Sequence, residues 1–110
     1  MKFRTLDSFK ADYKKLKPEH KDTFKKVVLD KFAPACDDWA SAQAAQAARR
    51  AYVWPASLRV DEMRRAPGIM EMTWSFASPD GRATFQFLSI DGEWFCVWRR
   101  IGNHGGYANP

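Results

Sequence analysis

The spacing of apolar residues changes along the chain, from helical in the first third to alternating in the last. Residues 1–6 alternate well enough to predict a short first strand. Phe9, Tyr13 and Leu16 then recur at helical spacing, so they share one face of an amphipathic helix whose lysines face solvent. The chain is therefore expected to open with a strand followed by a helix.

Local signals place the ends of the helices. Asp7 or Ser8 offers an N-cap for the first helix, and Pro18 suits the first turn of a second one. The apolar stripe of the second helix is predicted to end near Pro34. Asp37 or Asp38 could then cap a third helix in the Ala-rich stretch that follows.

The stretch of residues 34–54 admits more than one interpretation. Its alanines favour a helix but offer little to pack, so it could equally be a weakly folding insertion. Trp39, Tyr52 and Trp54 could cover an open sheet face or bind a partner, although core packing is the more common role of such aromatics.

From Ile69 onward the period becomes two, which predicts a three-stranded antiparallel meander. Residues 78–81 are expected to form a turn between the first two strands, and Asp91-Gly92 is expected to form the second hairpin turn. The expected inward positions are Met70, Met72, Trp74, Phe76, Ala83, Phe85 and Phe87. The opposite face is expected to present Glu71, Thr73, Arg82, Gln86 and either Arg99 or Arg100.

Length and composition favour one α+β domain over residues 1–110. A chain of 110 residues with 45% hydrophobic residues can bury one core, with the helices on one face of a small antiparallel sheet. No apolar run is long enough to cross a bilayer and no signal-peptide core is present, so a cytoplasmic protein with no membrane contact is expected. Cys36 and Cys96 lack metal-ligand spacing and are expected to be buried, idle thiols.

The net charge of +5 is concentrated in the first third of the chain. Residues 1–32 hold ten basic and five acidic side chains, whereas the charges of the remainder cancel. Clustered lysines can neutralise phosphates, which makes RNA a reasonable partner; a solvated helix face is the alternative explanation.

Candidate chemistry is confined to the late part of the chain. The sequence has no Gly-rich phosphate loop, metal motif or nucleophile elbow, and no cofactor is expected. RNA cleavage without a metal needs proton transfer and positive charge around the phosphate. Arg82, Arg99 or Arg100, His104 and Tyr107 contain the necessary groups, although any chain of this length has several such residues.

Three short segments, in this order, resemble RelE-type toxins of bacterial toxin–antitoxin systems. They are residues 58–72, from Leu58-Arg59-Val60 to Met72, then Gly81-Arg82-Ala83-Thr84-Phe85, then Trp98 to His104. The opening strand and two basic helices follow the same order, so the resemblance covers most of the chain except about residues 34–54.

The resemblance implies a fold, an activity and partners. Family members have a small antiparallel sheet with helices on one face, and many cleave mRNA in the ribosomal A site. By resemblance, Arg82 would stabilise phosphate charge, His104 would transfer protons, and Tyr107 would match a C-terminal aromatic. Arg100 is a further candidate catalytic residue. The ribosome, mRNA and a cognate antitoxin protein would be the partners. The expected RNA-binding residues are Lys10, Lys14, Lys15, Lys17, Arg64 and Arg65.

Two departures keep other functions open. Glu71 and Thr73 stand where cleaving members often have Lys or Arg, and the tail after His104 lacks basic residues. The superfamily also contains ParE-like members that inhibit gyrase and are not nucleases. A non-enzymatic binding module and a degenerate toxin-like protein are therefore the alternatives.

Overall fold

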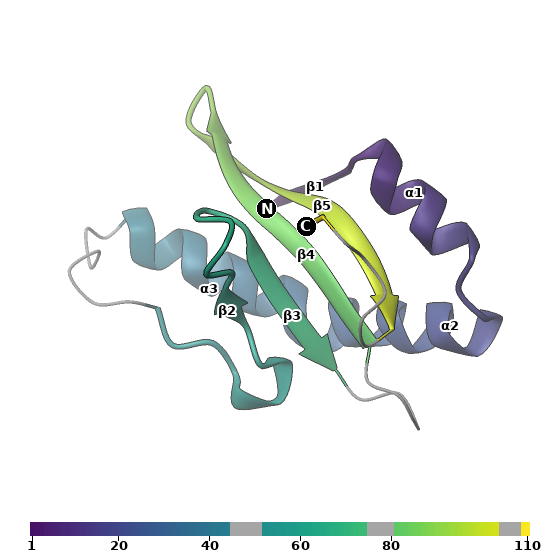
Figure 1. The fold of residues 1–110 in the computed structure, drawn as a ribbon. Coiled ribbons are helices and arrows are strands. Elements are labelled where there is room, and N and C mark those ends of the chain that lie inside the picture. The colour runs from purple at the N-terminus through teal and green to yellow at the C-terminus, as the bar shows by residue number, and fades with distance from the viewer. Residues whose placement is uncertain (45–51, 75–80, 104–108) are drawn as a thin grey trace.

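The fold is α+β, with a five-stranded mixed sheet covered by helices on one face (Figure 1). The computed structural model describes residues 1–44, 52–74, 81–103 and 109–110. The strands are β1 (Lys2–Thr5), β2 (Asp61–Glu62), β3 (Met70–Trp74), β4 (Gly81–Ile90) and β5 (Glu93–Asn103), in the spatial order β1-β5-β4-β3-β2. The helices are α1 (Asp7–Lys14), α2 (Pro18–Val27) and α3 (Ala33–Ala44), with a π-helical segment η1 (Val28–Phe32) and a 3-10 turn η2 (Ala56–Leu58).

The predicted meander is confirmed, but the sheet is not wholly antiparallel. Strands β3, β4 and β5 pair antiparallel as expected, whereas β1 runs parallel to β5, with Phe3 opposite Cys96. Parallel neighbours need a long crossover connection, and the helices between β1 and the meander supply one. The two-residue strand β2 was not predicted, because a pair of acidic residues carries no strand signal.

The second helix does not end near Pro34. Segments α2, η1 and α3 adjoin without a gap, and the Ala33 N–H bonds the Val28 carbonyl five residues back. This wider π turn lies directly before Pro34, where a regular helix would lose a hydrogen bond and meet the proline ring. None of the helices in the described ranges is long and apolar enough to span a membrane.

The expected caps are also wrong. The residue at the N-cap of α1 is Leu6, with no side-chain hydrogen bond, and Ser8 bonds elsewhere. Asp37 lies inside α3, where its carboxylate accepts a 2.9 Å hydrogen bond from the N-terminal ammonium of Met1. The predicted extension of the helix through residues 45–51 lies outside the described residues.

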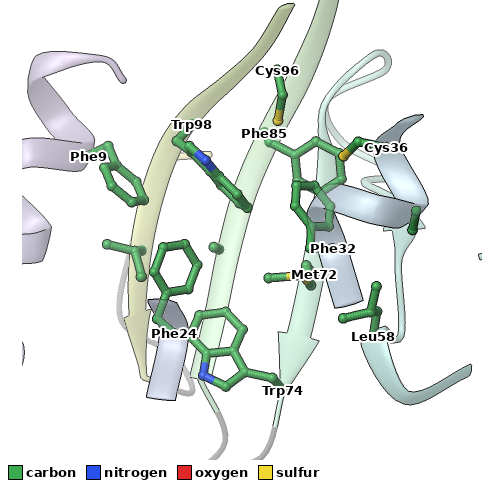
Figure 2. Close-up of a cluster of buried hydrophobic side chains, with 13 residues drawn as sticks. Phe9, Phe24, Phe32, Cys36, Leu58, Met72, Trp74, Phe85, Cys96 and Trp98 are labelled. Carbon is green, nitrogen blue, oxygen red and sulfur yellow. The ribbon is translucent and has the colours of Figure 1, made fainter. Parts of the chain in front are cut away.

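The core lies between the long helical segment and one face of the sheet, which we call the covered face (Figure 2). Met72, Trp74, Ala83 and Phe85 are buried there as predicted; Phe76 lies outside the described residues. The ring of Phe32 is fully buried and lies 4.9 Å, centroid to centroid, from both Phe85 and Trp98. This packing fixes the orientation of the strands and therefore of their opposite face.

The aromatics of the 34–54 stretch also pack on the covered face. Trp39 stacks on Phe87 at 3.9 Å, and Trp54 stacks on Phe32 at 5.9 Å, while Tyr52 meets Trp54 edge-on. Trp54 packs against the core as expected, whereas Trp39 and Tyr52 are half-buried beside it, and these rings do not cover the other face of the sheet.

Both cysteines are buried free thiols, as expected. Cys36 of α3 and Cys96 of β5 meet inside the core (Figure 2). Burial raises the pKa of the Cys96 thiol well above its usual value, and a hydrogen bond with Cys36 adds to the effect. The Cys96 thiol is therefore a poor nucleophile.

Candidate oxyanion site on the open face

The face of the sheet opposite the helices, which we call the open face, collects the polar side chains of the three meander strands. Strand alternation alone would send only one of Arg99 and Arg100 to this face. A bulge in β5 changes that: Thr84 pairs with Arg100 and Phe85 pairs with Trp98, so Arg99 is the extra residue. Bulges re-aim side chains in this way. Both arginines therefore carry polar contacts on or beside the open face.

Two donors on the open face converge on a single oxygen atom. The main-chain oxygen of Pro110 accepts a 3.1 Å hydrogen bond from the Thr84 hydroxyl and a 3.0 Å bond from Arg99 Nε. Arg99 Nη1 also donates to Gln86 Oε1, which fixes the plane of the guanidinium. We call Thr84 and Arg99 the oxygen cradle.

Thr84 is a fixed part of this cradle. Its exposed fraction is 0%, and it is the single polar residue buried in the described part of the chain. A buried hydroxyl needs a hydrogen-bond partner, because a buried polar group without one costs about 1–3 kcal/mol of stability. The cradle therefore holds an oxygen acceptor. Sequence analysis did not identify Thr84 as a site residue, because alternation placed it on the polar face and indicated nothing more.

Arg82 lies two residues before Thr84 on the same strand and has an incomplete set of contacts. Its Nη1 is 3.9 Å from Glu71 Oε1, an ion pair too long for a hydrogen bond. Its Nε is buried and has no acceptor among the described residues. Native proteins rarely leave a buried donor unmet, but this atom is covered, so a ligand oxygen could reach it only if the groups around it moved.

Arg100, the other predicted catalytic arginine, is held by Asp12 of α1. Arg100 Nε lies 2.6 Å from Asp12 Oδ2, and Nη2 lies 3.0 Å from Oδ1, a bidentate pair. Its Nη1 also donates to the Asn109 carbonyl at 3.2 Å. The sequence suggested a cation for phosphate, whereas the structure ties much of this charge to a carboxylate.

Opposing influences act on Asp12. Burial is the largest single influence and raises the pKa of Asp12. Together, four smaller influences outweigh burial and lower the pKa: the hydrogen bonds from Arg100 and the Ile101 N–H, and the charges of Arg100 and Lys15. The pKa of Asp12 therefore lies below its ordinary value. The pair holds its charge at neutral pH.

Asp12 and Ser8 also complete the edge of β5 where β1 ends. Leu6 N–H bonds the Trp98 carbonyl as the last strand-like contact. The Ser8 hydroxyl then donates to the Arg99 carbonyl at 2.7 Å, and Asp12 accepts the Ile101 N–H at 3.2 Å. Two side chains spaced four apart on α1 thus replace a strand. That spacing is visible in the sequence, but nothing there indicates which edge it would meet.

The predicted RNA-binding residues lie on two sides of the sheet. Lys10, Lys14, Lys15 and Lys17 are exposed on and just after α1, which packs beside β5 (Figure 1). Arg64 and Arg65 are exposed in the connection between β2 and β3 at the other edge. Because Arg82 pairs with Thr73 near the far end of β3, these two arginines are not brought next to it. The lysines border the α1 side of the site.

His104 and Tyr107, the remaining predicted catalytic residues, lie outside the described residues. Strand β5 is paired as far as Asn103, opposite Gly81, so the chain immediately before His104 is anchored beside Arg82. No group of three His, Cys, Asp or Glu side chains that could hold a metal occurs within the described ranges.

The site as described can hold an oxyanion with the cradle of Thr84 and Arg99 and the neighbouring Arg82. Comparisons of the chain with protein-family models, with curated proteins and with solved structures found no match.

Proposed function

We propose that this domain binds a phosphate of RNA on its open face and acts as a RelE-type toxin that cleaves ribosome-bound mRNA. The observation that carries the proposal is the oxygen cradle, in which Thr84 and Arg99 donate to one oxygen, that of Pro110, which a phosphate oxygen would have to replace. A non-bridging phosphate oxygen accepts hydrogen bonds in the same way and adds a negative charge.

Arg82 supports this assignment from the neighbouring position on β4. Its buried Nε is an unmet donor within the described chain, and its guanidinium adds positive charge beside the cradle. An arginine fork matches the geometry of phosphate better than a lysine does. In this proposal Thr84 and Arg99 hold one phosphate oxygen and Arg82 stabilises the charge that develops during cleavage.

The proposed reaction is attack of the RNA 2′-hydroxyl on the adjacent phosphorus. A base removes the 2′ proton, the bond from O2′ to phosphorus forms, the bond from phosphorus to O5′ breaks, and an acid protonates O5′. By resemblance to the family, His104 takes one of these proton transfers. The lysines of α1 would hold the RNA backbone outside the cradle, in the cytoplasm where ribosomes are present.

The test is expression of wild type and single variants, with primer extension on ribosome-bound mRNA. Arg99→Gln and His104→Ala should each lower cleavage about 100-fold, the usual effect of removing one transition-state donor or proton-transfer group. Lys26→Gln, exposed on α2, is the matched control and should cleave normally. Folded Arg99→Gln and His104→Ala proteins that cleave as well as wild type would overturn the proposal.

A second function is favoured by the two carboxylates beside the arginines. Asp12 neutralises Arg100, and Glu71 lies within ion-pair distance of Arg82, which lowers the positive charge available to a phosphate. A protein-binding module of the ParE kind, acting on gyrase or on a cognate antitoxin, needs no such charge. Inhibition of DNA supercoiling by purified protein, with no mRNA cleavage, would support this function instead.

A further inference from the structure

The open face carries a second group of side chains beside the oxygen cradle, where β1 lies along β5. Arg4 of β1 pairs with Val97 of β5, which pairs in turn with Gln86, the residue that accepts a hydrogen bond from the cradle arginine. Phe95 and Leu88 form the next such pair towards the β4–β5 turn. Because directly paired residues of neighbouring strands point to the same face, all of these side chains share the open face with the cradle.

Arg4 is an exposed cation that is held in place by two contacts. Its guanidinium carbon lies over the Phe95 ring, 5.0 Å from the ring centroid, which is within the range of a cation–π contact. Its Nη1 donates a 3.2 Å hydrogen bond to the Phe3 carbonyl. Because Arg4 is exposed, the side of the guanidinium that faces away from Phe95 is open to a ligand.

The positive charge of Arg4 is not neutralised within the described ranges. Lys2, the neighbouring cation on β1, pairs with Glu93 at 3.1 Å, whereas no described carboxylate forms an ion pair with Arg4. Leu88, with an exposed fraction of 39%, extends the accessible apolar surface beyond Phe95. A planar cation beside accessible apolar surface suits a flat aromatic ligand.

Arg4 is close enough to the cradle for one ligand to reach both. The strands β1 and β5 are neighbours, so the main chain of Arg4 lies about 5 Å from that of Val97. Val97 precedes Arg99 by two residues, which is about 7 Å along β5. A strand of RNA with a phosphate in the cradle can therefore bring an adjoining base to Arg4.

We propose that Arg4, supported from below by Phe95, stacks on an unpaired base of the RNA whose phosphate occupies the oxygen cradle. Arginine planes and aromatic rings are the usual stacking partners of bases in single-stranded RNA. Every base has a flat face, so the site responds to the presence of an unpaired base and not to its identity. The inference rests on the proposed function, because it needs a phosphate in the cradle.

The test compares two single-stranded hexanucleotides, one with all its bases and one abasic, by fluorescence anisotropy with the full chain. The abasic strand keeps every phosphate but should bind about tenfold more weakly, because it cannot stack. In NMR spectra of the isotope-labelled protein, the strand with bases should shift the Arg4 Nε–H signal. The abasic strand should leave that signal in place.

Two variants separate stacking from charge. Arg4→Lys keeps the charge but removes the planar guanidinium, so it should weaken binding of the strand with bases about tenfold and leave the abasic strand unaffected. Phe95→Leu removes the ring below Arg4 while keeping an apolar side chain, and should show the same selective loss. Lys26→Gln, exposed on α2, is the control and should bind both strands as wild type does.

Failure of this inference differs from failure of the proposed function. If Arg99→Gln weakens RNA binding but Arg4→Lys and the abasic strand bind as tightly as their wild-type counterparts, the cradle holds a phosphate and Arg4 only shields Phe95. That result overturns the stacking site alone. Equal weakening of both strands by Arg4→Lys would overturn it as well, because the loss would not depend on a base. Absence of any RNA binding by the wild-type chain would overturn both proposals.

Discussion

The two faces of the sheet are held by different kinds of interaction, although the same strands build both. On the covered face, aromatic rings such as Phe32, Phe85 and Trp98 pack against one another and exclude water. On the open face, Arg82 and Arg99 meet oxygen atoms in hydrogen bonds or a loose ion pair. The first face supplies most of the stability, and the second leaves donors that a ligand can use. Specificity for a partner is therefore expected from the face that contributes less to folding.

The largest expected effect on stability comes from truncating a buried side chain on the covered face. Phe32→Ala removes a fully buried ring that contacts Phe85, Trp98 and Trp54, and should lower the free energy of unfolding by about 3–5 kcal/mol. Chemical denaturation measures this loss. Leu29→Ala, at a side chain that is 73% exposed, is the control and should change stability by less than about 0.5 kcal/mol. Equal effects of the two substitutions would mean that packing of Phe32 on the covered face contributes no more to stability than an exposed side chain does.

An intermediate effect is expected from the polar tie between α1 and β5. Asp12→Asn should lower the free energy of unfolding by about 1.5–3 kcal/mol at neutral pH, because it breaks a charged hydrogen-bonded pair. Since folding lowers the pKa of Asp12, the stability it contributes is present above the ordinary value of 3.8 and is lost as the pH falls through the lower folded value.

The free energy of unfolding of wild type and Asp12→Asn, measured by chemical denaturation over a pH series, therefore tests the ion pair between Asp12 and Arg100. The difference between the two should be constant near neutral pH and should shrink below the ordinary pKa of Asp12. Asp22→Asn, exposed on α2, should show no such convergence. A difference that persisted unchanged into strong acid would show that the charge of Asp12 contributes nothing.

The smallest expected effect concerns occupancy of the open face. Removing Asn109 and Pro110 takes away the oxygen that accepts hydrogen bonds from Thr84 and Arg99, and so frees these two donors. A short RNA should then bind about threefold more tightly in fluorescence anisotropy, because a few weak hydrogen bonds no longer compete. The same truncation in Arg99→Gln should give no gain. Weaker binding after truncation of the wild-type chain would mean that these two residues assist the ligand.

Much of the fold could be predicted from the sequence where one periodicity dominates. Alternation identified the meander and its inward residues, and helical spacing identified α1 and α2. The predictions failed where tertiary packing overrides a local signal. Pro34 suggested a break, but the apolar positions Phe24, Phe32 and Cys36 keep one face on the sheet, and the π turn accommodates the proline.

The candidate site was predictable only in part. The polar character of the open face follows from alternation, and Arg82 was placed correctly on it. The β5 bulge could not be predicted, so the sequence left Arg99 and Arg100 as alternatives. The partner of Arg100 was unpredictable as well, because Asp12 is 88 residues away. Long-range contacts of this kind leave no periodic trace.

The side chains that replace a strand along β5 have a consequence for association between chains. An uncovered strand edge is a template for another polypeptide, and natural proteins block such edges. Here the block on Ile101 is a carboxylate, which accepts an N–H only weakly once it is protonated. Strong acid should therefore weaken the contact between Asp12 and Ile101 and expose this part of the β5 edge. Intermolecular β-pairing should follow, with fibrils or aggregates nucleating at β5 before the aromatic core unfolds.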